Sequence, residues 1–185
     1  MGQFGIQDRI FEPRQTCYLM LAISIMLIAY AARANISRWH IVLTGVFLLQ
    51  SCCSVLFWST FDRMSQTNRL PTSQRSTIHV VDAMMARLTF CFFLYYVFIV
   101  GELSNATCYS FHQAKLVRRF KRFFFSIALC GCGYNIMHSH KSYNALNNAL
   151  KGSNSRFGRI RDRHMRHHAM FHMWATLGVL IAMLV

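Results

Sequence analysis

Five separate apolar runs dominate the sequence and limit what it can fold into. They cover residues 17–33, 40–59, 78–101, 120–137 and 168–185. At about 1.5 Å of rise per residue, a helix over each run is compatible with crossing the core of a bilayer. Backbone polar groups inside a bilayer must be satisfied within the segment, which favours helices. The sequence therefore predicts an all-α fold, a polytopic transmembrane helix bundle of about five spans that forms one integral membrane domain over the whole chain.

The composition agrees with a membrane protein better than with a soluble domain. Apolar residues make up 54% of the chain and charged residues only 14%, against about 25% charged residues in a soluble domain. The net charge of +14 invites a nucleic-acid partner, but the basic residues follow no known nucleic-acid-binding motif. They flank the apolar runs, as Lys and Arg do at the ends of membrane helices. We expect membrane lipids as partners, with anionic head groups at the basic residues 156–168, and no nucleic acid.

The distribution of Lys and Arg predicts which ends of the spans face the cytosol. With five spans, residues 1–16, 60–77 and 138–167 lie on one side and carry twelve Lys and Arg, whereas the other side carries seven. The positive-inside rule places the side with twelve in the cytosol. The sequons at Asn35 and Asn105 both fall on the other side, where glycosylation takes place. We predict a polar cytosolic N-terminus (1–16), a basic cytosolic loop (138–167) and a lumenal or extracellular C-terminus.

Ionisable and hydroxyl side chains gather at the cytosolic ends of the spans. His168 and His172 lie about one helical turn apart at the start of the last run, so both imidazoles leave the same face of a helix. His79 and Asp82 open the third run from the same side, and Ser51 lies toward that end of the second run. Ionisable groups inside a span are costly and mark function by default. The sequence therefore predicts a polar site at this depth of the bundle.

These residue types match the chemistry of a catalytic zinc site. Three imidazoles and a water make a tetrahedral zinc site, and the metal lowers the pKa of that water toward 7. We expect His168, His172 and His79 as ligands. Asp82 would then orient the water and take its proton, and Ser51 or Ser54 would donate a hydrogen bond to a developing oxyanion. The alternative is that these side chains only hydrogen-bond from one helix to another.

The last run carries a pattern that resembles a known superfamily. It begins His168-Ala-Met-Phe-His172-Met-Trp-Ala-Thr-Leu-Gly, and H-x-x-x-H followed by small and apolar residues is the last-helix signature of the CREST superfamily of membrane proteins. That superfamily groups the alkaline ceramidases, the progestin and adiponectin receptors, the GPI-lipid remodelling proteins and the myomaker-like proteins. Asp82 looks like the aspartate that the superfamily has at the start of its third span. By this resemblance His168 and His172 would be zinc ligands, and Asp82 would hold the zinc-bound water.

The chain departs from the pattern of that superfamily in two ways. The stretch Ser51-Cys-Cys-Ser54 falls where the superfamily has S-x-x-x-H, but the fourth residue after Ser51 is Val55 and the fourth after Ser54 is Trp58. His79 is the substitute that we expect for the absent histidine. The superfamily has seven spans, so five runs predict a reduced seven-span fold in which the last span still starts on the cytosolic side.

Three functions follow from these patterns. The first is a zinc-dependent hydrolase of the CREST type that cleaves an amide or ester of a lipid at the cytosolic leaflet. The second is a non-catalytic, degenerate relative that acts as a membrane adaptor or receptor-like scaffold, and the absent histidine of the second run favours it. The third is a membrane di-iron desaturase or hydroxylase, indicated by the H-x-x-H-H pattern of His164, His167 and His168.

Overall fold

The computed structural model describes residues 13–33, 38–65, 73–100, 111–151 and 157–183, all of which are helical. Side chains are described within these ranges except at 31–33, 60–65, 73–79, 111, 143, 146–151 and 157–158. The elements are α1 (Pro13–Arg33), α2 (Arg38–Ser65), α3 (Ser73–Tyr95), the π-helical turn η2 (Tyr96–Val100) that continues α3, α4 (Phe111–Lys151) and α5 (Phe157–Met183). Each of the five apolar runs lies in one of these helices, as far as the structure describes it. The prediction of an all-α fold is confirmed.

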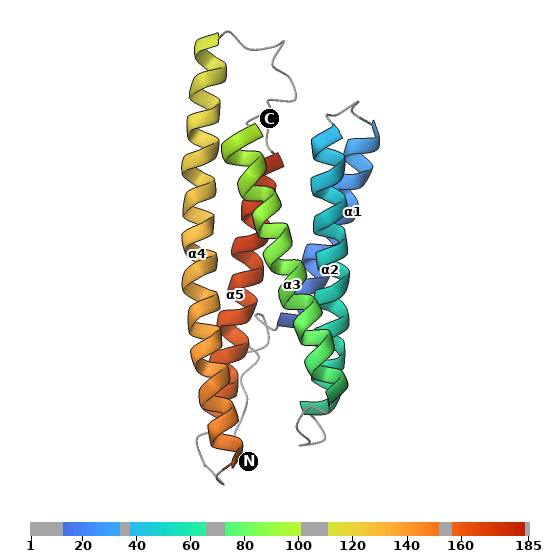
Figure 1. The fold of residues 1–185 in the computed structure, drawn as a ribbon, viewed down its shortest axis with the longest axis vertical. Coiled ribbons are helices and arrows are strands. Elements are labelled where there is room, and N and C mark those ends of the chain that lie inside the picture. Colours follow the sequence, from blue (N-terminus) through green and yellow to red (C-terminus); the bar gives the residue numbers. More distant parts are fainter. Residues whose placement is uncertain (1–12, 34–37, 66–72, 101–110, 152–156, 184–185) are drawn as a thin grey trace.

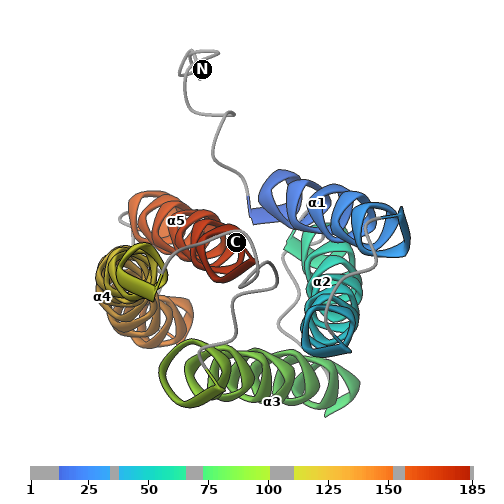
Figure 2. The ribbon, with the colours of Figure 1, turned by 90° about the horizontal axis from the view of Figure 1, so that it is seen from above.

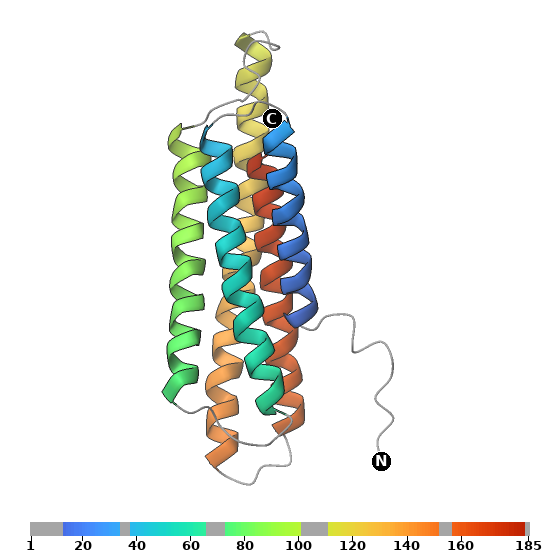
Figure 3. The same cartoon turned by 90° about the vertical axis from the view of Figure 1, so that its right-hand side faces the viewer.

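The helices run alternately up and down along one long axis (Figures 1 and 3). The first residues of α1, α3 and α5 therefore lie at the same end of the bundle as the last residues of α2 and α4. Seen along that axis, α4, α5, α1, α2 and α3 follow one another around the bundle (Figure 2). Close packing follows the same order, and α3 approaches α4 chiefly through η2. Because of this alternation, the second half of α2 and the first halves of α3 and α5 lie at the same level along the long axis of the bundle.

Many polar side chains lie inside the bundle, and many large apolar side chains lie on its surface. In α2, Ser51 and Ser54 are fully buried, whereas Ile41, Leu49 and Leu56 are more than half exposed. An amphipathic helix of a soluble bundle shows the reverse pattern. Most of the buried polar groups lie in the half of the bundle where α1 begins, whereas the other half holds an apolar core together with the buried side chains of His40 and Thr44. That core contains Leu43, Phe47, Phe93, Tyr96, Phe125 and Val179.

The fourth helix is much longer than the apolar run that predicted it. The run covers residues 120–137, but α4 has 41 residues and is therefore roughly 60 Å long. Its first turns project beyond the other helices in Figure 3. The segment 138–167, predicted as a loop, is helical up to Lys151 and again from Phe157. Hydropathy underestimates such a helix because polar residues remain helical where one face packs on a neighbour, as Ser139 of α4 does on α5.

Among the residues that the structure describes, two stretches are long and apolar enough to cross a membrane, judged by length and composition. These stretches are Arg38–Ser59 in α2 and Val80–Val100 in α3 and η2. The five apolar runs are therefore confirmed as helices, but they are not confirmed as five membrane spans. The apolar run of α4 contains Lys121 and Arg122, and that of α5 contains His168 and His172. These polar side chains lower the mean hydropathy of the two helices.

Candidate functional site

A buried carboxylate joins α2 to α3. The Ser54 hydroxyl donates a hydrogen bond of 2.6 Å to Oδ1 of Asp82, and the side-chain Nε2 of Gln50 donates to the same oxygen at 3.1 Å. Gln50 also donates to the Ser54 oxygen at 2.9 Å. Asp82 is only 7% exposed, and a buried carboxylate requires donors of this kind. We call Gln50, Ser54 and Asp82 the carboxylate cluster.

Ser51 and Ser54, the two hydroxyls predicted from the sequence, have different roles in the structure. Oγ of Ser51 donates to the carbonyl oxygen of Phe47 at 2.8 Å and lies 3.1 Å from Oγ of Ser24 in α1. Ser24 donates to the Met20 carbonyl in the same way. Ser51 therefore links α2 to α1, and Ser54 is the serine that binds Asp82. Gln50, which was not predicted, lies four residues before Ser54 and shares its helix face, and that spacing is the signal that could have identified it.

Three histidines of α5 form a row along one face. His164, His168 and His172 follow one another at intervals of four residues, with ring centroids 5.8 and 4.8 Å apart. The indole of Trp58 from α2 packs against the row. Its centroid lies 4.7 Å from the ring of His168, 6.3 Å from that of His164 and 6.5 Å from that of His172. We call the three histidines the histidine row. His164 was not among the predicted ligands, although its four-residue spacing from His168 indicates the shared face.

Side chains of α1 hold the deepest histidine of the row. His172 is 2% exposed, and its Nδ1 lies 3.0 Å from Oγ1 of Thr16 and 3.4 Å from Sγ of Cys17. The Thr16 hydroxyl donates to the Pro13 carbonyl at 2.9 Å, so we assign the proton of the Thr16–His172 bond to Nδ1. The remaining nitrogen, Nε2, then carries a lone pair. Thr16 and Cys17 orient this imidazole, and neither was predicted.

A serine of α4 bridges the other two histidines of the row. Nδ1 of His164 lies 3.0 Å from the carbonyl oxygen of Ser139, and a carbonyl can only accept, so His164 donates. The Ser139 hydroxyl lies 3.1 Å from Nδ1 of His164 and 3.2 Å from Nδ1 of His168. Ser139 is 2% exposed. The row is thus held by α1 at one end and by α4 at the other.

The carboxylate cluster and the histidine row adjoin each other. Trp58 follows Ser54 by one helical turn on α2, and its ring lies against the row. Asp82 of α3 is thus connected to His168 and His172 of α5 through Ser54 and Trp58, which lie one turn apart on α2.

The described residues do not complete a zinc site with three histidine ligands. His79 lies in α3, but its side chain is outside the described part of the structure. Trp58 stands where the resemblance requires the histidine of the second run, and an indole has an N–H donor but no lone pair for a metal. Within the described residues, no group of three His, Cys, Asp or Glu is arranged to hold a metal. The zinc site with His79 as its third ligand stays a prediction.

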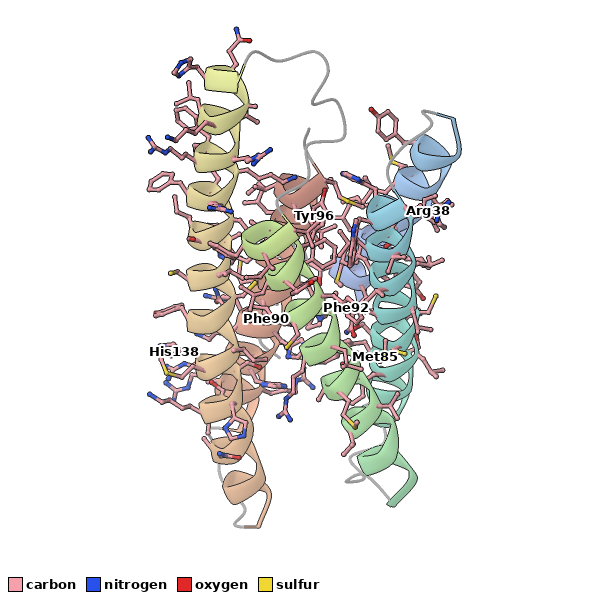
Figure 4. The ribbon with its side chains drawn as sticks, turned by 45° about the horizontal axis from the view of Figure 1, so that its top comes forward. Arg38, Met85, Phe90, Phe92, Tyr96 and His138 are labelled. Carbon is pink, nitrogen blue, oxygen red and sulfur yellow. The ribbon has the colours of Figure 1, made fainter. Side chains whose placement is uncertain are left out.

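The remaining histidines of this end lie apart from the site. The rings of His138 and His167 stack 5.0 Å apart, and Figure 4 shows His138 on the outer side of α4. Nδ1 of His167 donates to Oδ1 of Asn135 at 3.1 Å. His140 is exposed and lies 3.4 Å from the amide nitrogen of Asn144. The H-x-x-H-H pattern is thus divided between two faces of α5, because His167 packs on His138 while its two partners face Trp58.

Burial and neighbouring charges lower the pKa of His167. Partial burial disfavours the imidazolium most, and the charges of His138, Arg163 and Arg166 act in the same direction. His167 precedes the last apolar run and lies outside the predicted span. Its imidazole therefore remains neutral to a lower pH than an ordinary histidine would.

Known proteins offer no relative for this site. The chain matches no protein family, no curated protein and no solved structure with which it was compared. The similarity to the CREST superfamily therefore rests on the three short patches of sequence around Ser51, Asp82 and His168. Function has to be argued from the carboxylate cluster and the histidine row themselves.

Proposed function

We propose that this chain is a multi-pass membrane protein that acts as a non-catalytic, receptor-like or adaptor scaffold around a buried polar site. The position of Trp58 carries the proposal. Trp58 is 1% exposed and packs against all three histidines of the row, so it fills the place of a third ligand from α2. A site built this way retains its polar groups without a three-histidine metal centre.

The surface of the bundle supports the membrane part of this proposal. Large apolar side chains are exposed on all five α-helices, and Met26 and Ile99 are 70% and 69% exposed. Exposed apolar side chains in this number are unfavourable in water and are stable in lipid. Inside the bundle, Ser24, Ser51 and Ser54 are fully buried and hydrogen-bonded. Small polar residues of this kind join the helices of membrane bundles.

The proposed orientation places the N-terminus in the cytosol and the C-terminus on the lumenal or extracellular side. Exposed arginines of the first turns of α5, at positions 159, 161, 163 and 166, would then face anionic head groups of the cytosolic leaflet. Extraction at alkaline pH tests the membrane assignment, because a multi-pass protein stays in the membrane pellet. A glycan shift that is lost in Asn105→Gln supports the orientation. Release of the chain into the alkaline supernatant would contradict the membrane assignment.

The competing hypothesis is a zinc-dependent lipid hydrolase with His79, His168 and His172 as ligands. Metal content of the protein purified in mild detergent separates the two. The scaffold predicts no stoichiometric zinc in the wild type, and zinc bound by Trp58→His, which supplies the third imidazole beside two that are already in place. Trp58→Phe is the matched control because it removes the indole and adds no ligand.

The outcomes of this measurement are distinct. About one zinc per wild-type chain, lost in His168→Ala, would overturn the scaffold in favour of the hydrolase. Two irons per chain would instead indicate the di-iron enzyme. Circular dichroism and thermal unfolding of each variant show whether the bundle is intact, so that a loss of metal is read only from folded protein.

A further inference from the structure

A partly open cavity of about 70 Å³ lies beside the polar site. Side chains of all five α-helices line it, and aromatic rings form part of its wall, among them Phe90 of α3, Phe125 of α4 and Trp174 of α5. His172, the deepest histidine of the row, lies at its edge with Gln50 of the carboxylate cluster. The cavity therefore joins an apolar space to the polar groups.

Two of the residues that line this cavity each contain a buried oxygen atom without a hydrogen-bond partner among the described residues. These atoms are Oε1 of Gln50 and Oγ1 of Thr89, and the two residues are 5% and 7% exposed. Nε2 of Gln50 donates to Asp82 and Ser54, which fixes which way the amide points. Its Oε1 is therefore the atom left for another donor. A buried polar atom without a partner is destabilising, so a molecule that satisfies both oxygens would be stabilised there.

We propose that this cavity binds a neutral single-chain lipid through a hydroxyl group. The hydroxyl donates to Oε1 of Gln50, which can only accept, and accepts from the hydroxyl of Thr89. The hydrocarbon chain lies against the aromatic wall. This inference rests on the proposed function, because a molecule with a long apolar chain reaches the cavity from the bilayer.

The chemistry of the wall excludes charged ligands. A carboxylate would bring no donor for Gln50 Oε1 and would be repelled by Asp82, whose oxygen accepts from the same glutamine. An ammonium group would lose its hydration in a largely aromatic space. A hydroxyl carries no charge, and it both donates and accepts, as the two oxygens require.

The packing of α3 leaves a side of the cavity open for entry. This helix packs on α2 and approaches α4 chiefly through η2. Phe90 lies on α3, on the side toward α4 (Figure 4), and its ring lines the cavity while 41% of the residue is exposed. A chain entering between α3 and α4 would pass this ring first.

Quenching of tryptophan fluorescence by a brominated alcohol tests the proposal. The probe is bromoundecanol, added to the full-length protein in nanodiscs, and its matched control is the methyl ether of the same alcohol, which cannot donate. We expect saturable quenching by the alcohol and about fivefold weaker binding of the ether, the effect of one lost hydrogen bond. The quenched component should disappear in Trp174→Phe, because Trp174 lines the cavity.

Three variants locate the effect. Thr89→Val keeps the shape of the side chain and should weaken the alcohol and the ether alike, roughly two- to tenfold, because the oxygen atom of either probe accepts from the Thr89 hydroxyl. Ala86→Phe fills the cavity and should abolish binding of both probes, whereas Met84→Phe, at an exposed position of the same helix, should not.

Equal binding of the alcohol and the ether would overturn the hydroxyl assignment. If the alcohol causes no saturable quenching, the cavity does not bind this class of lipid and is filled by water instead. Neither result would affect the proposed scaffold, which fails instead on stoichiometric zinc or on release from the membrane at alkaline pH.

Discussion

The hydroxyl of Ser54 lies 2.6 Å from Oδ1 of Asp82 and connects the second half of α2 to the first half of α3. Both residues are buried, and Gln50 donates to the same carboxylate oxygen. Because the bond involves a charged acceptor, its loss leaves a carboxylate with one donor fewer in a place that water does not reach easily.

Ser54→Ala should therefore lower the free energy of unfolding by about 1.5–3 kcal/mol. The matched control is Ser51→Ala, one turn away on the same helix and equally buried, which loses only a bond to a backbone carbonyl and a contact with Ser24. Its cost should be about 1 kcal/mol. Unfolding in mixed detergent measures both. If Ser51→Ala lowers the free energy of unfolding as much as Ser54→Ala does, the bond to the carboxylate contributes no more stability than a bond to a backbone carbonyl.

Gly131→Ala should destabilise the contact between α4 and α5. A Cβ at this position would overlap Cδ2 of Trp174, so the indole or the helix must move. Overpacking of this kind costs about 1–3 kcal/mol. Gly133→Ala is the control on the same helix, because its Cβ would meet nothing within 4 Å. It should be neutral or stabilising, since alanine favours a helix more than glycine does. Thermal unfolding that ranks the two variants the other way would contradict this packing.

Arg122→Gln should destabilise the end of the bundle at which α3 continues into η2. The guanidinium donates to the carbonyl oxygens of Phe98 at 3.1 Å and Val97 at 3.4 Å, and so satisfies carbonyls at the end of a helix. We expect a loss of about 1 kcal/mol of stability and faster hydrogen exchange in η2. Arg119→Gln, an exposed position one turn earlier, should change neither quantity.

Stability should depend on pH through His167. Its pKa is lowered in the folded protein, first by burial and then by His138, Arg163 and Arg166. Between the ordinary histidine pKa of about 6.5 and the lower folded value, the unfolded chain binds more protons, so stability falls as the pH falls through this window. His167→Asn should flatten that part of the curve of melting temperature against pH. A wild type and a variant with parallel curves from pH 5 to 8 would exclude this contribution.

The helices were predictable because each depends on residues close together in the chain. An apolar run of 17 residues or more needs only its own composition to favour a helix, and all five runs are helical where described. Their ends were less predictable. The segment 138–151 is polar, and it remains helical because Ser139 and Ser142 are buried where α4 packs on α5.

The candidate site was predictable in its depth but not in its contacts. Asp82, His168 and His172 open their apolar runs from the same side, and in the structure Asp82 binds Ser54 while the two histidines pack on Trp58, one turn further along α2. Which serine binds Asp82 depends on how α2 is rotated about its axis, and the sequence left Ser51 and Ser54 as near equivalents. The rotation turns Ser54 toward α3 and Ser51 toward α1.

The sequence by itself determined an all-helical chain with histidines and an aspartate at one depth, because hydropathy and helical spacing are local properties. Only the tertiary structure decided what surrounds those groups. Trp58 packs against the histidine row, Thr16 and Ser139 hold its imidazoles, and Gln50 leaves one oxygen in a cavity. These contacts depend on the rotation and separation of helices far apart in the chain, and pairwise packing of side chains decides both.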